Sequence, residues 1–327
     1  MKRYFKHASW LAVMVLAWGF QSCSDDGTYE IPDAKSGLHN DLIKRSLGPN
    51  VVGGAIEFAY AMAQLPTEGK IVEASVEASI GGATGTVLQN KSFNTGGSVE
   101  IGSPSTTDGK LTKVTFTKDT SAATLRYNYV IPEEARGKSL TFKFSAKSSN
   151  GQVVTYDAGP YEISSMDMVL DLVAKDPSAA YISIADLKLY TAAEAAASPS
   201  KVDLVYLYRA TPASFGHALV APATDPMYLP GVTLPTGVSN NTKLIKAFTV
   251  RDQQLARLQY GVYVDDIDLK TKDFSTAPNF ITDLRAEYGA WVETADGTYR
   301  ALVFINAVTN TPAVKEIRIS IKRLKVK

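Results

Sequence analysis

Cysteine is almost absent from this sequence of 327 residues, which contains a single one, at position 23. One cysteine cannot make a disulfide framework, and it cannot supply a cysteine-based zinc site. Histidine and tryptophan are also scarce, with three of each. Neither charge is in excess, since 34 Lys and Arg residues stand against 33 Asp and Glu residues, so the basic surplus of a nucleic-acid-binding protein is missing. The remaining composition, with 45% hydrophobic residues, is that of an ordinary globular protein.

The N-terminus has the features of an export signal. Lys2, Arg3 and Lys6 precede an apolar run of 13 residues, Ala8–Phe20. The run is long enough for the core of a signal peptide and shorter than the roughly 20 residues of a membrane-spanning helix. We therefore expect residues 1–22 to be a lipoprotein signal peptide that is removed from the mature protein.

The apolar run stops at Phe20-Gln21-Ser22-Cys23, which resembles the relaxed lipobox of Bacteroidetes lipoproteins. The resemblance implies cleavage before Cys23 and lipidation of Cys23; the alternative is an incidental thiol behind an ordinary export signal. Ser24-Asp25-Asp26 resembles the Ser/Asp-rich signal that sends lipoproteins of that phylum to the outer face of the outer membrane. Several acyl chains on one residue give stable anchoring. We therefore expect an outer-membrane protein that is anchored by lipid and faces the cell exterior.

Removal of the signal narrows the chemistry available to the mature chain. Three basic residues leave and no acidic residue does, so 31 basic and 33 acidic side chains remain and the net charge becomes −2. We expect no nucleic-acid partner on this basis. His39 and His217 are the remaining histidines, and acylated Cys23 is not a nucleophile. We expect no cofactor.

A polar tether at residues 23–40 leads to a first domain at residues 41–165. Apolar and polar residues alternate in this domain, strictly so from Ile71 to Ile80 and again around Leu125 and Phe142. A period of two is typical of half-buried strands, and the Gly-Gly, Asp-Gly and Asn-Gly pairs between the runs are turn signals. The pattern predicts an antiparallel β-sandwich.

Residues 166–327 are predicted to form a second sandwich. Helices are expected at Ala192–Ala197 and Val250–Leu258, and five prolines between Ala210 and Asn241 predict an extended loop or a pair of loops. Strands are expected at Met168–Val173, Tyr181–Tyr190, Lys201–Arg209, Tyr260–Val264, Ala290–Thr294, Tyr299–Asn306 and Lys315–Leu324. The predicted fold class is all-β, with two tandem antiparallel, immunoglobulin-like β-sandwich domains behind a lipoprotein signal and tether.

Three segments carry a resemblance to a known family: Asn40–Asn50, Tyr129–Lys138 and Arg251–Gly261. At the level of whole patterns, the mature chain resembles an uncharacterised family of Bacteroidetes surface lipoproteins whose domain has no known function. The resemblance implies a surface lipoprotein associated with glycan uptake or adhesion, and it brings no catalytic residues with it.

The proline-rich loop contains the candidate ligand-binding residues. Phe215 and Tyr228 are not explained by strand periodicity, and aromatic rings in loops often contact ligands. Arg251 follows shortly after and offers a planar fork of donors for a carboxylate or sulfate. The alternatives are that the loop packs back over an apolar part of the sandwich and that Arg251 makes an internal salt bridge.

Asp265, Asp266 and Asp268 are weak candidates for a metal site. They cluster at the end of a predicted strand, and Ca²⁺ prefers oxygen ligands of this kind. The segment lacks the glycine and the final glutamate of an EF-hand loop. A solvated acidic turn is the alternative, and we expect no metal.

Two classes of function fit these observations. The first is a non-catalytic surface protein, a binding or adhesion module that contacts an extracellular glycan or surface protein. The alternative is a β-sandwich glycoside hydrolase or polysaccharide lyase that uses carboxylates, for which Glu133, Glu134, Glu287 and Glu293 are the nearest pairs in the sequence. We expect the first, and therefore no enzyme activity.

Replacing the lipobox cysteine tests the predicted anchor. Cys23→Ala should release the protein from membranes, because no acyl chain can then be attached, and cell fractionation with immunoblotting measures this. Protease added to intact cells should degrade the wild-type protein. Full protection from that protease contradicts the outward orientation and leaves the lipid anchor standing.

Overall fold

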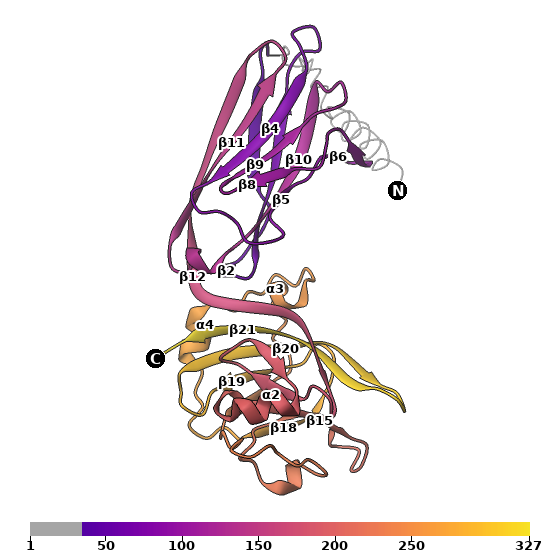
Figure 1. Cartoon of the computed structure of the whole chain (residues 1–327), viewed down its shortest axis with the longest axis vertical. Helices are drawn as coiled ribbons and strands as arrows, with labels where there is room; N and C mark the ends of the chain where they lie inside the picture. The colour runs from indigo at the N-terminus through magenta and orange to yellow at the C-terminus, as the bar shows by residue number, and fades with distance from the viewer. Residues whose placement is uncertain (1–34) are drawn as a thin grey trace, which may run out of the picture. The chain divides into compact units, whose positions relative to one another are not determined.

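The structure, a computed structural model that describes residues 35–327, consists largely of β-strands (Figure 1). The strands form two sandwiches in succession along the chain, which confirms the predicted fold class. Cys23 and most of the predicted tether lie outside the described residues. From residue 35 to the C-terminus, no helix combines the length and the apolar character that crossing a membrane requires.

The N-terminal sandwich packs a four-stranded sheet against the first part of a longer sheet. The four-stranded sheet has the order β1 (His39–Lys44), β3 (Ala55–Ala63), β10 (Ala122–Val130) and β5 (Val87–Leu88). The opposing strands are β12 (Val153–Lys175), β11 (Ser139–Ser148), β4 (Ile71–Ala78), β9 (Leu111–Thr115) and β8 (Thr106–Asp108). β2 (Asn50–Val52) joins β12 in parallel, and β6 (Lys91–Asn94) and β7 (Gly97–Glu100) form a separate hairpin.

Alternation along these strands produces a single core rich in aromatic rings. The apolar side chains of β3 from Ile56 to Met62 are buried at every second position, and the residues between them face outward. Phe58 lies 5.1 Å from Phe142 and 5.2 Å from Phe144, measured between ring centroids across the sandwich. Both pairs meet edge to face, which stabilises them beyond the burial of apolar area.

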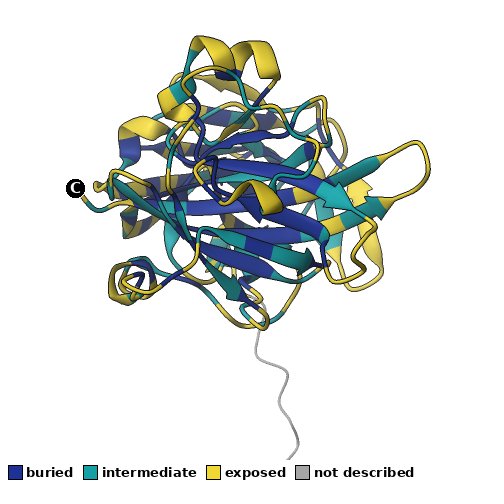
Figure 2. Ribbon diagram, turned by 90° about the horizontal axis from the view of Figure 1, so that it is seen from below, coloured by how far each residue is buried: buried dark blue, intermediate teal, exposed yellow. Residues whose placement is uncertain are grey.

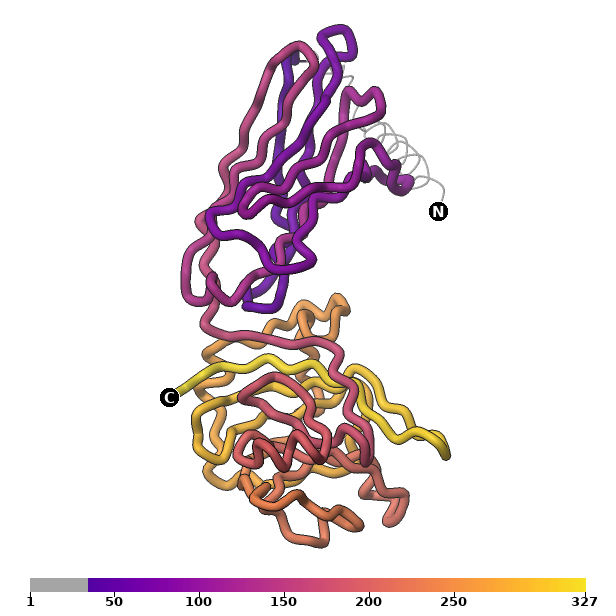
Figure 3. The backbone as a smooth tube through the Cα atoms, in the orientation of Figure 1, coloured from indigo at the N-terminus to yellow at the C-terminus, as the bar shows by residue number. Residues whose placement is uncertain are grey.

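The strand β12 belongs to both sandwiches. Its first part pairs with β11, and its second part pairs with β21 (Lys315–Lys325). Within residues 35–327, the chain passes between the two groups of strands once, along this strand (Figure 3). The cores nevertheless stay separate: the first has no buried member after Ile163, and the others have none before Met166 except Val51. The domain bounds 41–165 and 166–327 stay a prediction.

The C-terminal sandwich uses the rest of the shared sheet and a second sheet of five strands. The shared sheet continues from β21 to β20 (Tyr299–Asn310), β19 (Gly289–Glu293) and β17 (Lys243–Ala247). The five-stranded sheet has the order β14 (Lys188–Tyr190), β13 (Tyr181–Ser183), β15 (Leu204–Arg209), β16 (Gly216–Val220) and β18 (Phe280–Leu284). Buried strands occupy the middle of the fold, and connecting segments are exposed around them (Figure 2).

Helical segments cover the outer face of the shared sheet in this domain. α3 (Gln253–Ala256) and α4 (Asp266–Thr271) bring Leu255 and Leu269 against Trp291, which is only 6% exposed. The strand predicted at Tyr260–Val264 is wrong. This segment makes a single isolated bridge and then turns into α4, because it connects two short helices rather than two strands.

The segment from Ala210 to Asn241 is a pair of loops on either side of a strand, which is one of the two arrangements that its prolines predicted, and it is not a single extended loop. Gly216–Val220 forms β16 inside the five-stranded sheet, because a short apolar run fits between two of the prolines. The rest of the segment includes the 3-10 helix η3 (Pro226–Tyr228) and packs over the outer face of that sheet, where Leu229 joins a hydrophobic cluster. The segment therefore covers an apolar surface, which was the alternative to a ligand-binding loop.

The remaining helical turns follow their sequence signals. The helix predicted at Ala192–Ala197 is confirmed as α2, and Thr191 and Glu194 form a capping box at its start. Pro199 begins the 3-10 helix η2 (Pro199–Lys201) directly after α2. The turn predicted after Pro132 is the 3-10 helix η1 (Glu133–Ala135).

A buried carboxyl group lies just before β15. Asp203 is 4% exposed, and its Oδ2 accepts the backbone N–H of Ile184 at 2.7 Å. Burial raises the pKa of Asp203 to about 7, although the N–H groups of Ile184 and Ala185 oppose the shift. Desolvation of the charged form therefore outweighs the hydrogen bonds.

Truncating one ring of the N-terminal core tests whether the two cores unfold separately. Phe142→Ala should destabilise the N-terminal sandwich by about 3–5 kcal/mol, because a large buried ring is lost. Trp291, the only tryptophan after residue 22, reports the C-terminal sandwich by its fluorescence in urea. We expect the part of the circular dichroism transition that comes from the N-terminal strands to move to lower urea concentration. The midpoint of the Trp291 fluorescence transition should stay unchanged. An equal shift of both signals contradicts the separation.

The Asp203→Asn variant tests the cost of burying that carboxyl. Its folded-state pKa of about 7 lies above the ordinary value of 3.8, so its contribution to stability is greatest at low pH and is lost as the pH rises through about 7. Asn keeps an oxygen acceptor and does not titrate. The variant should therefore gain stability relative to the wild type between about pH 4 and pH 7, measured as the free energy of unfolding in urea. A difference that does not change with pH contradicts the raised pKa.

Candidate ligand-binding site

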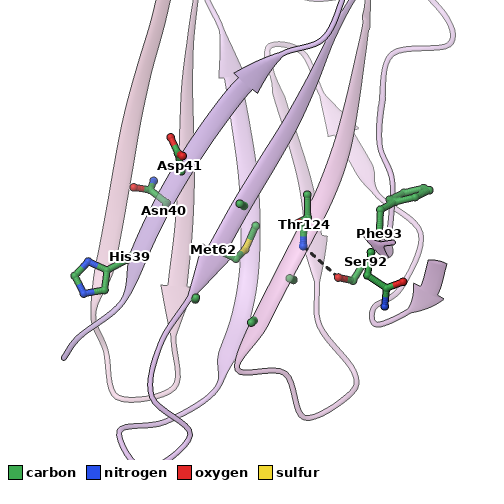
Figure 4. Close-up of a pocket in the computed structure, with 12 residues that line it drawn as sticks. His39, Asn40, Asp41, Met62, Ser92, Phe93 and Thr124 are labelled. Atoms are coloured by element: carbon green, nitrogen blue, oxygen red, sulfur yellow. Dashed lines mark hydrogen bonds between the residues drawn. The ribbon is translucent and has the colours of Figure 1, made fainter. Parts of the chain in front are cut away.

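A groove of about 500 Å³ lies on the outward face of the four-stranded sheet in the N-terminal sandwich. β1, β3 and β10 form its base, and the β6 hairpin strand borders it. His39, Asn40 and Asp41 lie on one side, and Ser92 and Phe93 lie on the other (Figure 4). The volume is within the range of small-molecule sites.

The floor of the groove is made of small side chains. Ala61 of β3 pairs with Asp41 of β1 and with Thr124 of β10, and Ala63 pairs with His39 and Ala122. Alanine is depleted in strands, so its repeated use on an outward face is unusual. Methyl groups here leave an open channel between the taller side chains on either side.

Hydrogen bonds fix both walls of the groove. The Oδ1 atom of Asp41 accepts the backbone N–H of Leu42 at 2.8 Å, which orients the carboxylate. On the other side, the Oγ atom of Ser92 accepts the N–H of Thr124 at 3.1 Å and ties β6 to β10 (Figure 4). β3 and β10 lie between the two walls, so the walls are about three strand spacings apart, or roughly 14 Å. The groove is therefore set by the backbone of the sheet.

The predicted ligand-binding aromatics lie elsewhere, on the C-terminal sandwich. Phe215 is 6% exposed and belongs to the hydrophobic cluster beneath the proline-rich segment, so the expectation of an accessible ring at this position is wrong. Tyr228 is half-buried and stacks on Phe280, with ring centroids 3.5 Å apart. Both rings pack between the segment and the sheet that it covers, which gives each a structural role.

Arg251 is half-exposed and forms an ion pair with Glu287 at 2.7 Å. Its guanidinium group also lies 5.2 Å from the ring centroid of Tyr260, whose hydroxyl donates to Glu287 at 3.0 Å. None of these contacts of Arg251 involves Phe215 or Tyr228. The internal salt bridge, which was the alternative for Arg251, is present.

The acidic cluster caps a helix instead of ending a strand. Asp265 is the N-cap of α4 and forms a capping box with Asp268, and Asp266 bonds to Lys270 at 2.6 Å. Hydrogen bonding to Lys270 holds the pKa of Asp266 below its usual value. These carboxylates are used to start the helix. Between residues 35 and 327, no group of three or more His, Cys, Asp or Glu side chains could hold a metal ion.

A buried ion pair next to the predicted Arg251 site escaped the sequence analysis. Asp252 and Lys322 are both 0% exposed, and Lys322 Nζ lies 2.6 Å from Asp252 Oδ2. The ammonium group also donates to Gln254 Oε1 at 2.8 Å and to the carbonyl of Val264 at 3.1 Å. Burial lowers the pKa of Lys322, and Asp252 opposes the shift. The two residues are 70 positions apart, so no local pattern reveals the pair.

Two family models match the described part of the chain, one after the other. Residues 35–163 match the model for a domain of unknown function, DUF4466, and residues 164–326 match the model for another, DUF8576. No curated protein matches the chain.

Solved structures include a DUF4466 family protein from Parabacteroides merdae, which is 45% identical with a TM-score of 0.78 and aligns over 89% of this chain and 99% of that one. The major pilin subunit BcpA of Bacillus cereus is 9% identical, aligns over 86% of this chain and 65% of its own, and has a TM-score of 0.28. A fragment of the major pilin GBS80 of Streptococcus agalactiae is 10% identical, aligns over 87% and 91%, and also has a TM-score of 0.28.

The pilin similarities are too low to carry an argument. The match to the Parabacteroides protein extends over nearly all of the described chain, and it confirms the resemblance to a Bacteroidetes family of unknown function. The chain therefore belongs to the DUF4466 family.

Proposed function

We propose that this protein is a lipid-anchored module on the exterior of the outer membrane that binds an extracellular ligand without catalysis. The observation that carries the proposal is the groove on the outward face of the N-terminal sandwich. The signal core that ends at Cys23 supports the anchor, and the sandwich architecture is typical of binding and adhesion domains. We propose the groove as the ligand site in place of the proline-rich segment.

The alternative of a carboxylate-dependent hydrolase or lyase receives less support from the acids it requires. Arg136 hydrogen-bonds to Glu133 and holds the pKa of that carboxyl below its usual value. Glu287 and Glu293 pair with arginines, at 2.7 Å and 2.8 Å. A general acid needs a raised pKa, and neighbouring arginine favours the ionised form. Asp203 has the raised pKa, but it is buried and bonded to backbone.

Filling the groove tests the proposed function. Ala61→Tyr places a large side chain on the groove floor, and Ala59→Tyr makes the same change two residues earlier on the same outward face, outside the lining. The purified mature protein is tested against a panel of polysaccharides and surface proteins, and each is scored for retention and for cleavage products. We expect retention of a ligand by the wild type and by Ala59→Tyr, loss of retention with Ala61→Tyr, and no products.

Two results contradict the proposal in different ways. Release of cleavage products supports the enzyme alternative. If Ala61→Tyr retains the ligand as well as Ala59→Tyr and the wild type do, the ligand does not use the groove. Circular dichroism of each variant controls for misfolding, and both substitutions introduce a residue that is common in strands.

A further inference from the structure

The groove combines an apolar base with hydrogen-bonding walls. Every outward position of β3 except Glu57 is alanine, so this strand gives the base a flat apolar strip, beside which Thr124 of β10 adds one hydroxyl group. Asp41 and Asn94 belong to opposite walls, and Phe93 adds an aromatic face. A ligand that fills the groove must therefore offer a flat apolar surface and polar groups at its edges.

One oxygen of Asp41 is available to a ligand. Oδ1 is held by the N–H of Leu42, and Oδ2 has no hydrogen-bond partner among residues 35–327. On the opposite wall, Asn94 Oδ1 accepts the N–H of Gly96 at 2.9 Å, which fixes the amide, and the Nδ2 group has no hydrogen-bond partner among residues 35–327. An oriented carboxylate and an oriented amide donor can bind hydroxyl groups of one saccharide from two sides.

Phe93 is fixed by a cation on one face. The guanidinium carbon of Arg126 lies 4.0 Å from the centroid of the Phe93 ring. This contact holds the ring in position and occupies one of its two faces. The other face remains for the C–H surface of a ligand, and a ring that is already held loses little freedom when the ligand binds.

The charge of the lining discriminates between classes of ligand. Among residues 35–327, no lysine or arginine lines the groove, and Asp41 and His39 are the titratable side chains of its lining. A sulfate, phosphate or uronic acid therefore meets the like charge of Asp41, while the guanidinium group of Arg126 lies against Phe93, outside the lining. A purely apolar molecule leaves the polar walls without partners.

We propose, on the basis of the function proposed above, that the groove binds a neutral saccharide. The saccharide lies along the alanine floor, and one of its pyranose rings places a C–H face against Phe93. Neighbouring hydroxyl groups donate to Asp41, and the amide of Asn94 donates to a hydroxyl oxygen on the other side. The pyranose ring combines the flat apolar face and the polar edge that this lining requires.

The decisive measurement compares a neutral polysaccharide with a carboxylated derivative of the same backbone, by isothermal titration calorimetry on the mature protein. We expect the wild type to bind the neutral form at least about tenfold more tightly. Phe93→Ala should weaken binding of the neutral form roughly three- to tenfold, because a ring contact is lost. Phe248→Ala, at an exposed ring of the C-terminal sandwich, is the matched control and should bind as the wild type does.

Asp41→Asn separates hydrogen bonding from charge. It should weaken binding of the neutral form and strengthen binding of the carboxylated form, because the like charge is gone, so the preference between the two narrows. Asp108→Asn, at an exposed position of β8, should leave the preference unchanged.

The possible results distinguish this inference from the proposed function. If the carboxylated form binds as tightly as the neutral form and Ala61→Tyr abolishes both, the groove is the site and the neutral class is wrong. If only a protein ligand is retained and Ala61→Tyr abolishes that retention, the groove is the site and the proposal of a saccharide ligand is wrong. If Ala61→Tyr has no effect on any ligand, the groove function itself fails.

Discussion

A single strand, β12, is the constraint on which the rest of the structure depends, because it hydrogen-bonds within both sandwiches. It can serve two separate cores only if its buried face changes along its length, and a register shift between Val169 and Leu172 provides part of that change. Asp167 lies where the two halves meet. Its carboxylate binds Arg136 at 2.6 Å and Arg323 at 2.7 Å. One acidic side chain on β12 is thus bonded to an arginine from each of the two domains.

The two domains differ in how their outer sheet faces are used. In the C-terminal domain, helices and the proline-rich segment cover both outer faces. Holding the α3 segment there requires the buried pair of Asp252 and Lys322, whose desolvation is offset only because Gln254 and Val264 complete the bonds of the ammonium group. The groove face of the N-terminal sandwich carries alanine instead of an apolar stripe, so it needs no such cover.

The sequence predicted the fold well where structure is local and poorly where it is not. Alternation from Ile71 to Ile80 identifies β4, because a half-buried strand has a period of two. Proline density concealed β16, since its pairing partners are distant in sequence. Aromatic rings in a loop pointed to Phe215, whose burial depends on a sheet that no local window reveals. The groove was not predicted, because the feature that creates it is the small size of Ala61 and its neighbours. Alanine at alternate positions of β3 is the one sign of it in the sequence.

A site on a sheet differs from a site on a loop in what binding costs. Loop side chains must be ordered when a ligand arrives, whereas Ala61, Asp41 and Thr124 are held in register by the backbone hydrogen bonds of three neighbouring strands. The contacts of Phe93 with Arg126 and of Ser92 with Thr124 extend this order to the far wall. A shallow groove buries only part of a ligand and makes few contacts with it. Such contacts give useful affinity only if the protein side chains lose little conformational freedom on binding. The rigid outward sheet of the N-terminal sandwich meets that condition.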